Sequence, residues 1–203
     1  IKVFYHHCKV NSIRLEKMNF TIRYTSNIPL RLGLAGSSAI ITATFKALMA
    51  FYGVVIAKPV LANLILSVEN NELGIAAGLQ DRVAQVYEQP VFMNFDKELM
   101  DTQGYGEYVP IDLSSMPNVY IGFRRSMSEG TEVLHNNLRA RYNIGEPAVL
   151  AARKEWAELT ERFRDALAAG DQAAMFALIN RNFDLRRSLV PVEPGNIEMV
   201  TLA

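Results

Sequence analysis

The sequence predicts an α+β protein whose 203 residues divide into a mixed N-terminal domain and a mostly helical C-terminal domain. Short segments that alternate apolar and polar residues, as strands do, occur only before about residue 124, among apolar helical patterns. After about Gly130 the patterns are almost entirely helical. We therefore place the boundary within residues 113–124 and assign residues 1–115 and 116–203 to the two domains.

The first expected elements follow from periodicity and from helix start and stop residues. Residues 20–24 alternate as a strand does. Apolar residues fall all round the helix expected at 37–52, so we expect it to be buried on most sides, with Gly53 ending it. Pro59 starts a second helix that runs to about residue 73 with one apolar face.

The remaining elements are separated by glycine and proline. Gly74 and Gly78 bracket a short loop before a helix at 79–87, and strands are expected at 91–95, 108–111 and 119–123. The C-terminal helices are expected at 132–141, 147–169 and 172–189, with Glu146-Pro147 and Gly170-Asp171 between them.

Composition excludes several classes of protein. The chain has 21 basic and 21 acidic side chains, so no positive field favours nucleic acid or an anionic membrane surface. Its one cysteine, Cys8, excludes an internal disulfide and favours a reducing, cytoplasmic location. One cysteine and three histidines are too few for a structural zinc site to be expected. Lys46 and the polar lead-in argue against a membrane span in the apolar residues 39–57. Nothing in the sequence indicates an oligomeric state.

The strongest chemical pattern is the turn at residues 29–39, PLRLGLAGSSA. Gly33 and Gly36 allow the backbone to approach an anion closely, and the following helix supplies free N–H groups and the positive end of its dipole. Ser37 and Ser38 add hydroxyls, the second placed to reach a metal ion carried by phosphates. The pattern therefore predicts phosphate binding, although no lysine follows as in the Walker motif. The simpler alternative is that Ser37 only caps the helix.

A second pattern lies at residues 69–82, ENNELGIAAGLQDR. Asp81 starts a helix beside Arg82, where a carboxylate can act as a base or position a hydroxyl, or can simply favour the helix dipole. Glu69 lies near a helix end that disfavours negative charge, which indicates a cation partner, either an arginine or Mg²⁺. A solvated surface glutamate is the alternative.

Two further segments are weaker candidates. Residues 124–131, RRSMSEGT, predict either a mobile lid over a substrate or an ordinary solvated loop, and they lead into a helix with His135 and Arg139. Arg186 and Arg187 end a helix, where the dipole favours cations, and they equally suit a carboxylate or phosphate.

These motifs together resemble the GHMP small-molecule kinases. The stretch from Pro29 through GLAGSSA resembles their central phosphate-binding motif, and GLQD, ending at Asp81, resembles the Gly-x-x-Asp that carries the catalytic aspartate. The stretch LGIAAGLQDRVAQVY at 73–87 is most similar to the glucuronokinases, a group of sugar-1-kinases, and NFDLRR at 182–187 and NIEMV at 196–200 agree. The resemblance runs from about Asn27 to the end.

The resemblance implies a two-domain kinase with the active site between its domains, and ATP and Mg²⁺ as cofactors. The residues that would wrap the ATP phosphates are Gly33, Leu34, Ala35, Gly36, Ser37, Ser38 and Ala39. Ser38 and Glu69 would hold Mg²⁺, and Asp81 would orient or deprotonate the anomeric hydroxyl of a sugar, D-glucuronate by this resemblance. The candidates for binding the sugar and its carboxylate are Gln80, Arg82, Arg139 and Arg186.

The sequence also departs from the family pattern. Nothing before Asn27 matches the family's N-terminal Pro-Gly-Arg motif, and Ala203 precedes the position of its C-terminal glycine-rich loop. We therefore expect the chain to be the middle of a larger kinase. The alternatives are a heptose-phosphate, fucose or arabinose kinase of the same superfamily, and a non-catalytic ligand-binding module with this fold.

Overall fold

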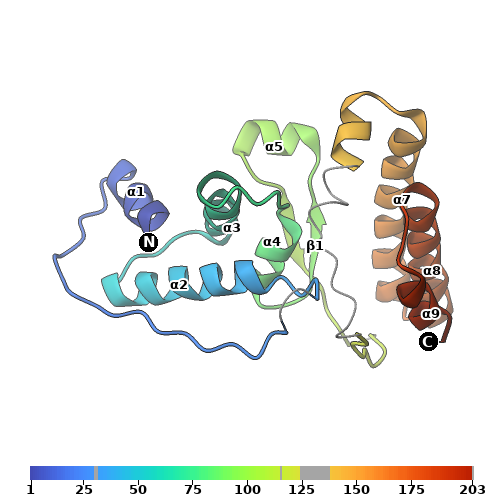
Figure 1. Ribbon diagram of the computed structural model, residues 1–203, viewed down its shortest axis with the longest axis horizontal. Helices are drawn as coiled ribbons and strands as arrows, with labels where there is room; N and C mark the ends of the chain where they lie inside the picture. Colours follow the sequence, from blue (N-terminus) through green and yellow to red (C-terminus); the bar gives the residue numbers. More distant parts are fainter. Residues whose placement is uncertain (30–31, 115, 124–137, 203) are drawn as a thin grey trace. The chain divides into compact units, whose positions relative to one another are not determined.

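The computed structural model describes residues 1–29, 32–114, 116–123 and 138–202. These residues are mixed helix and strand, mostly helical, with one small sheet (Figure 1). The chain divides into two compact units, residues 1–111 and 112–203. Among the helices described, none combines the length and apolarity that crossing a membrane requires.

The first unit is built around a helical core. Its helices are α1 (Lys2–Val10), α2 (Gly36–Tyr52), α3 (Lys58–Ser67), the π-helical turn η1 (Val68–Glu72), α4 (Gln80–Tyr87) and α5 (Lys97–Gln103). The buried core is formed by apolar side chains of α1 to α4, among them Phe4, Phe45, Ile65, Val83 and Val86. Figure 1 shows α4 lying against the beginning of α2. This packing brings together the two segments that carry the predicted chemistry.

The sheet has two antiparallel strands, β1 (Val91–Asn94) and β2 (Glu107–Pro110), with Val91 opposite Pro110 and Asn94 opposite Glu107. Helix α5 connects them. Asp96 caps that helix, because its carboxylate accepts hydrogen bonds from the backbone N–H groups of Glu98 and Leu99. Both strands confirm the sequence prediction to within one or two residues.

The second unit is dominated by two long helices, α7 (Pro147–Ala169) and α8 (Gln172–Leu189), which lie side by side (Figure 1). They end and begin at the predicted Gly170-Asp171 turn, where the Asp171 carboxylate accepts from the Ala174 N–H at 3.0 Å. Residues 138–143 are helical, and α9 (Pro194–Leu202) ends the described chain. The predicted start of the helix at 132–141 lies outside the described residues.

Several predicted features are wrong. Residues 20–24 and 119–123 are irregular chain, and neither pairs with β1 or β2. Alternation alone does not make a strand, because a strand needs a neighbour to accept its backbone hydrogen bonds. Helix α2 is buried along one stripe rather than on most sides, and Phe51 is 43% exposed. Helices α1 and α5 were not expected, because neither carries a long apolar period.

Candidate functional site

The turn before α2 has an unusual backbone. Gly33 and Ala35 both adopt left-handed conformations, with φ of +71° and +52°. Ala35 is the residue that precedes the helix, and it makes no side-chain cap hydrogen bond to the first turn. The alternative in which Ser37 is the cap is therefore wrong, because Ser37 lies inside the helix. The first N–H groups of a helix that has no side-chain cap can bind an anion.

The Ala35 carbonyl is the point that fixes this turn. It accepts hydrogen bonds from the Ser38 hydroxyl at 3.0 Å, the Ala39 N–H at 3.1 Å and the Gln85 amide at 3.1 Å. The Thr42 hydroxyl lies 2.8 Å from the Ser38 carbonyl and 3.2 Å from Gln85 Oε1. The Gln85 side chain therefore joins α4 to the beginning of α2.

Gln85 was missed by sequence reasoning, although its position relative to Asp81 was a usable clue. The two residues are four apart on α4, so they lie on the same face, about 6 Å apart along the helix axis. The Asp81 carboxylate is 56% exposed, whereas Gln85 is partly buried against α2. Helix α4 thus brings an accessible carboxylate and the α2 turn to one corner of the first unit.

Glu69 and Arg82 form a buried ion pair. The Glu69 side chain is 1% exposed and that of Arg82 is 8% exposed. Arg82 Nε donates to Glu69 Oε2 at 2.5 Å, and Nη2 pairs with the same oxygen. The cation partner predicted for Glu69 is thus an arginine, and the surface-glutamate alternative is wrong. The pair joins η1 to the first turn of α4.

The loop between η1 and α4 is held from both sides. From η1, the Glu69 carbonyl accepts from the Ile75 N–H at 2.8 Å, and Asn70 Oδ1 accepts from the Ala77 N–H at 3.1 Å. From α4, Arg82 Nη1 donates to the Gly78 carbonyl at 3.1 Å. The same nitrogen lies 3.0 Å from Asp81 Oδ2. The position of Asp81 is therefore set by a hydrogen-bonded framework.

A metal role for Ser38 and Glu69 can be tested against their surroundings. Among the described residues, no three histidine, cysteine, aspartate or glutamate side chains gather into a metal-binding group. A Mg²⁺ ion that arrives with phosphates needs only one or two protein ligands. The Ser38 hydroxyl donates its proton to the Ala35 carbonyl and retains its lone pairs, but the side chain is 0% exposed. Glu69 Oε2 is committed to Arg82, so Glu69 has only Oε1 to offer.

The other predicted substrate residues are distributed over both units. Gln80 begins α4 and is exposed beside Asp81. Arg139 lies in the helical residues 138–143 and Arg186 on α8, both exposed and both in the second unit. Of the three candidate arginines, Arg82 is the one that contacts Asp81. The predicted lid at 124–131 and His135 lie outside the described residues.

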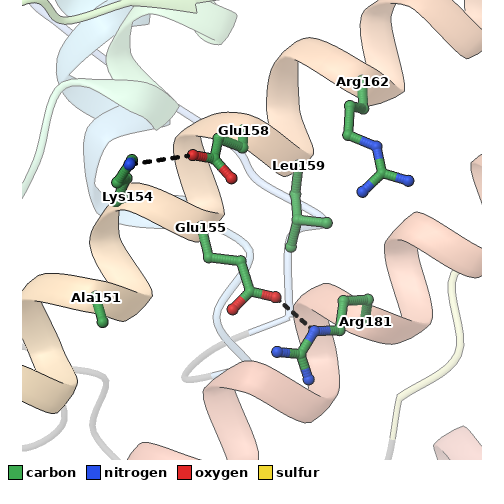
Figure 2. A pocket seen from close by; sticks show the side chains of 7 residues that line it. All are labelled: Ala151, Lys154, Glu155, Glu158, Leu159, Arg162 and Arg181. Atoms are coloured by element: carbon green, nitrogen blue, oxygen red, sulfur yellow. Dashed lines mark hydrogen bonds and ion pairs between the residues drawn. The ribbon is translucent and has the colours of Figure 1, made fainter.

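Two hollows on α7 and α8 are formed by the second unit alone. The first, about 540 Å³, is lined largely by charged side chains, four of which are paired (Figure 2): Arg181 donates to Glu155 at 2.5 Å, and Lys154 lies 3.8 Å from Glu158. The second, about 370 Å³ and mostly apolar, includes Arg186 in its lining. Neither contains a residue of the α2–α4 corner, so we do not take either as the site of the chemistry.

Replacing Gly33 by alanine should destabilise the chain by about 1–2 kcal/mol, the cost of a left-handed residue with a Cβ. The cost is conformational, because a Cβ at Gly33 would meet no atom within 4 Å. Urea unfolding measures it. Gly122→Ala is the matched control, since its Cβ is equally unobstructed and its φ is not left-handed. Equal stability of the two variants would show that the turn relaxes without strain.

Replacing Gln85 by leucine should destabilise the chain by about 1–2 kcal/mol, because the hydrogen bonds to Ala35 and Thr42 are lost. Gln85→Glu should cost more, since a carboxylate oxygen would then face the Ala35 carbonyl. The same urea experiment tests both, with the exposed Gln89→Leu as reference. A Gln85→Glu variant as stable as the native chain would show that the contact of Gln85 with the Ala35 carbonyl does not hold α4 to α2.

Comparison with known proteins shows which domain the first part of the chain resembles. Residues 2–89 match the GHMP kinases N terminal domain. No solved structure matches the chain significantly. This matched segment contains the turn at residues 29–39 and Asp81, the two motifs on which the resemblance rests. The expectation that the resemblance begins near Asn27 is wrong, because the matched domain begins at residue 2.

The chain is also similar to plant glucuronokinases over its whole length. It is 43% identical to Glucuronokinase 1 and 45% identical to Probable glucuronokinase 2 of Arabidopsis thaliana, and both alignments cover 100% of the chain. The chain spans only 57% and 56% of the length of these relatives. A D-glycero-alpha-D-manno-heptose 7-phosphate kinase of Campylobacter jejuni is 28% identical over 86 residues, which are 42% of this chain and 25% of the kinase.

Proposed function

We propose that the chain is part of an ATP-dependent sugar kinase that phosphorylates the anomeric C1 hydroxyl of D-glucuronate to give D-glucuronate 1-phosphate. The similarity to two glucuronokinases over the whole chain supports the substrate. The observation that carries the chemistry is the Gln85 bridge, which joins the helix of Asp81 to the turn before α2. A phosphoryl-transfer site needs an anion-binding turn and an acceptor-activating carboxylate close together.

In this proposal residues 33–39 bind the ATP phosphates through the first N–H groups of α2. Asp81 accepts the proton of the sugar C1 hydroxyl, whose oxygen forms a bond to the γ-phosphorus. The bond from that phosphorus to the β–γ bridging oxygen breaks, and ADP leaves. Ser38 and Glu69 are the residues that would hold Mg²⁺, and the ion would neutralise phosphate charge when bound.

The second unit has its own place in the proposal. Residues 1–115 and 116–203 correspond, in this proposal, to the two domains of the kinase fold. Arg139 and Arg186 remain the candidates for the sugar carboxylate, because Arg82 is committed to Glu69 and Asp81. We also propose a cytoplasmic location, since the buried Cys8 is a free thiol.

A sugar panel tests this function. ADP release is measured with D-glucuronate, a heptose 7-phosphate, fucose and arabinose, using Asp81→Asn as the blank. We expect turnover with glucuronate and little with the others. Turnover with a neutral sugar or a heptose phosphate, and none with glucuronate, would show that glucuronate is not the substrate. Nucleotide binding without any turnover would favour the non-catalytic alternative.

A further inference from the structure

We propose that Arg82 is a positioning residue, which holds the Asp81 carboxylate in a single orientation and does not bind the sugar. The inference rests on the proposed function, because it assumes that Asp81 serves the acceptor hydroxyl. Its basis is the set of contacts made by the Arg82 guanidinium, which reaches Glu69, the Gly78 carbonyl and Asp81.

The guanidinium has few donors left for a ligand. Nε and Nη2 face Glu69, while Nη1 faces the Gly78 carbonyl at 3.1 Å and Asp81 Oδ2 at 3.0 Å. A guanidinium carries five N–H donors in a rigid planar fork, and these contacts occupy most of them. With an Arg82 side chain only 8% exposed, a sugar carboxylate would have to displace a protein oxygen to bind there.

The burial of the pair indicates a role beyond stability. Taking two charges out of water is costly, and a buried ion pair is often no more stabilising than apolar side chains of the same size. Here the buried end, Glu69, orients the guanidinium, and the other end reaches the accessible Asp81 carboxylate. A charge-assisted hydrogen bond from a fixed donor restricts the rotation of that carboxylate before the acceptor arrives.

A sugar-binding role and a positioning role predict different kinetics. Loss of a sugar ligand raises the KM for glucuronate and leaves kcat nearly unchanged. Loss of orientation lowers kcat and leaves both KM values nearly unchanged, because neither substrate loses a contact. A purely structural role lowers thermal stability without changing the kcat of the folded enzyme.

The test uses Arg82→Lys in the full chain, because lysine keeps the positive charge but cannot reach three acceptors as a fork. We expect kcat to fall about 10- to 100-fold, with both KM values within about threefold of the native values. Arg162→Lys, an exposed arginine on α7, is the matched control and should leave the kinetics unchanged. Arg82→Gly should recover part of its kcat when guanidinium ion is added, which structural damage alone would not produce.

A double-mutant cycle closes the test. If Arg82 acts through Asp81, Arg82→Lys should not lower the residual turnover of Asp81→Asn further. Should Arg82→Lys fail to unfold cooperatively, the Glu69→Gln/Arg82→Gln variant replaces it, with Glu69→Gln as reference. A native kcat in Arg82→Lys, a double variant no slower than Glu69→Gln, or a raised glucuronate KM alone would overturn the inference. Absence of turnover in the native chain would instead overturn the proposed function on which it rests.

Discussion

Replacing Asp81 by asparagine is expected to lower kcat about a hundredfold to ten-thousandfold, the usual contribution of a general base. The amide keeps the size of the carboxylate but cannot accept the proton of the acceptor hydroxyl. Affinity for the nucleotide should stay close to the native value, because in the proposed mechanism this carboxylate serves the sugar rather than ATP. Steady-state kinetics and calorimetric titration with an ATP analogue measure the two effects separately.

The control for this variant addresses the alternative that Asp81 merely favours a helix dipole. Glu98 occupies the first turn of α5 just as Asp81 occupies the first turn of α4. If the dipole is the whole explanation, Asp81→Asn and Glu98→Gln should each cost only about 0.3–1 kcal/mol of stability and leave turnover intact. Native turnover in Asp81→Asn would therefore remove this residue from the mechanism.

Replacing Arg82 by methionine is expected to lower the free energy of unfolding by about 3–5 kcal/mol. Methionine fills much of the arginine volume but leaves the Glu69 carboxylate, 1% exposed, without its cation. An uncompensated buried charge has neither water nor a counterion, so the folded state bears its full desolvation cost. Urea unfolding monitored by circular dichroism measures the loss.

The chain provides a matched comparison in an exposed ion pair. Arg181 and Glu155 lie 2.5 Å apart, with side chains 53% and 34% exposed. Arg181→Met should cost at most about 1 kcal/mol, because water solvates the remaining glutamate. Equal losses in Arg82→Met and Arg181→Met would contradict the importance of burial in the Glu69–Arg82 pair.

The helices that sequence reasoning predicted best are those with local start and stop residues. Helix α7 begins at Pro147 and ends before Gly170, and α2 ends before Gly53. These three helix ends follow from the local sequence alone. The alternating patterns at 91–95 and 108–111 correspond to real strands because these two segments pair with each other. The strand expected at 119–123 was not, because alternation does not reveal whether a partner is present.

The candidate site shows the same division between local and distant information. The left-handed turn and the first turn of α2 follow from neighbouring residues, so the motif at 33–39 was visible in the sequence. The partner of Glu69 was narrowed to an arginine or a metal ion, but the choice of Arg82 depends on how η1 packs against α4. The contact of Gln85 with Ala35 spans 50 residues of chain, and no local pattern predicts it.

The proposed function requires the α2 turn to bind the ATP phosphates beside the Asp81 carboxylate. A crystal structure of the chain with a non-hydrolysable ATP analogue tests it most directly. We expect phosphate oxygens within about 3 Å of the first N–H groups of α2, with the terminal phosphate on the side of Asp81. A nucleotide bound elsewhere, with those N–H groups facing water, would contradict it.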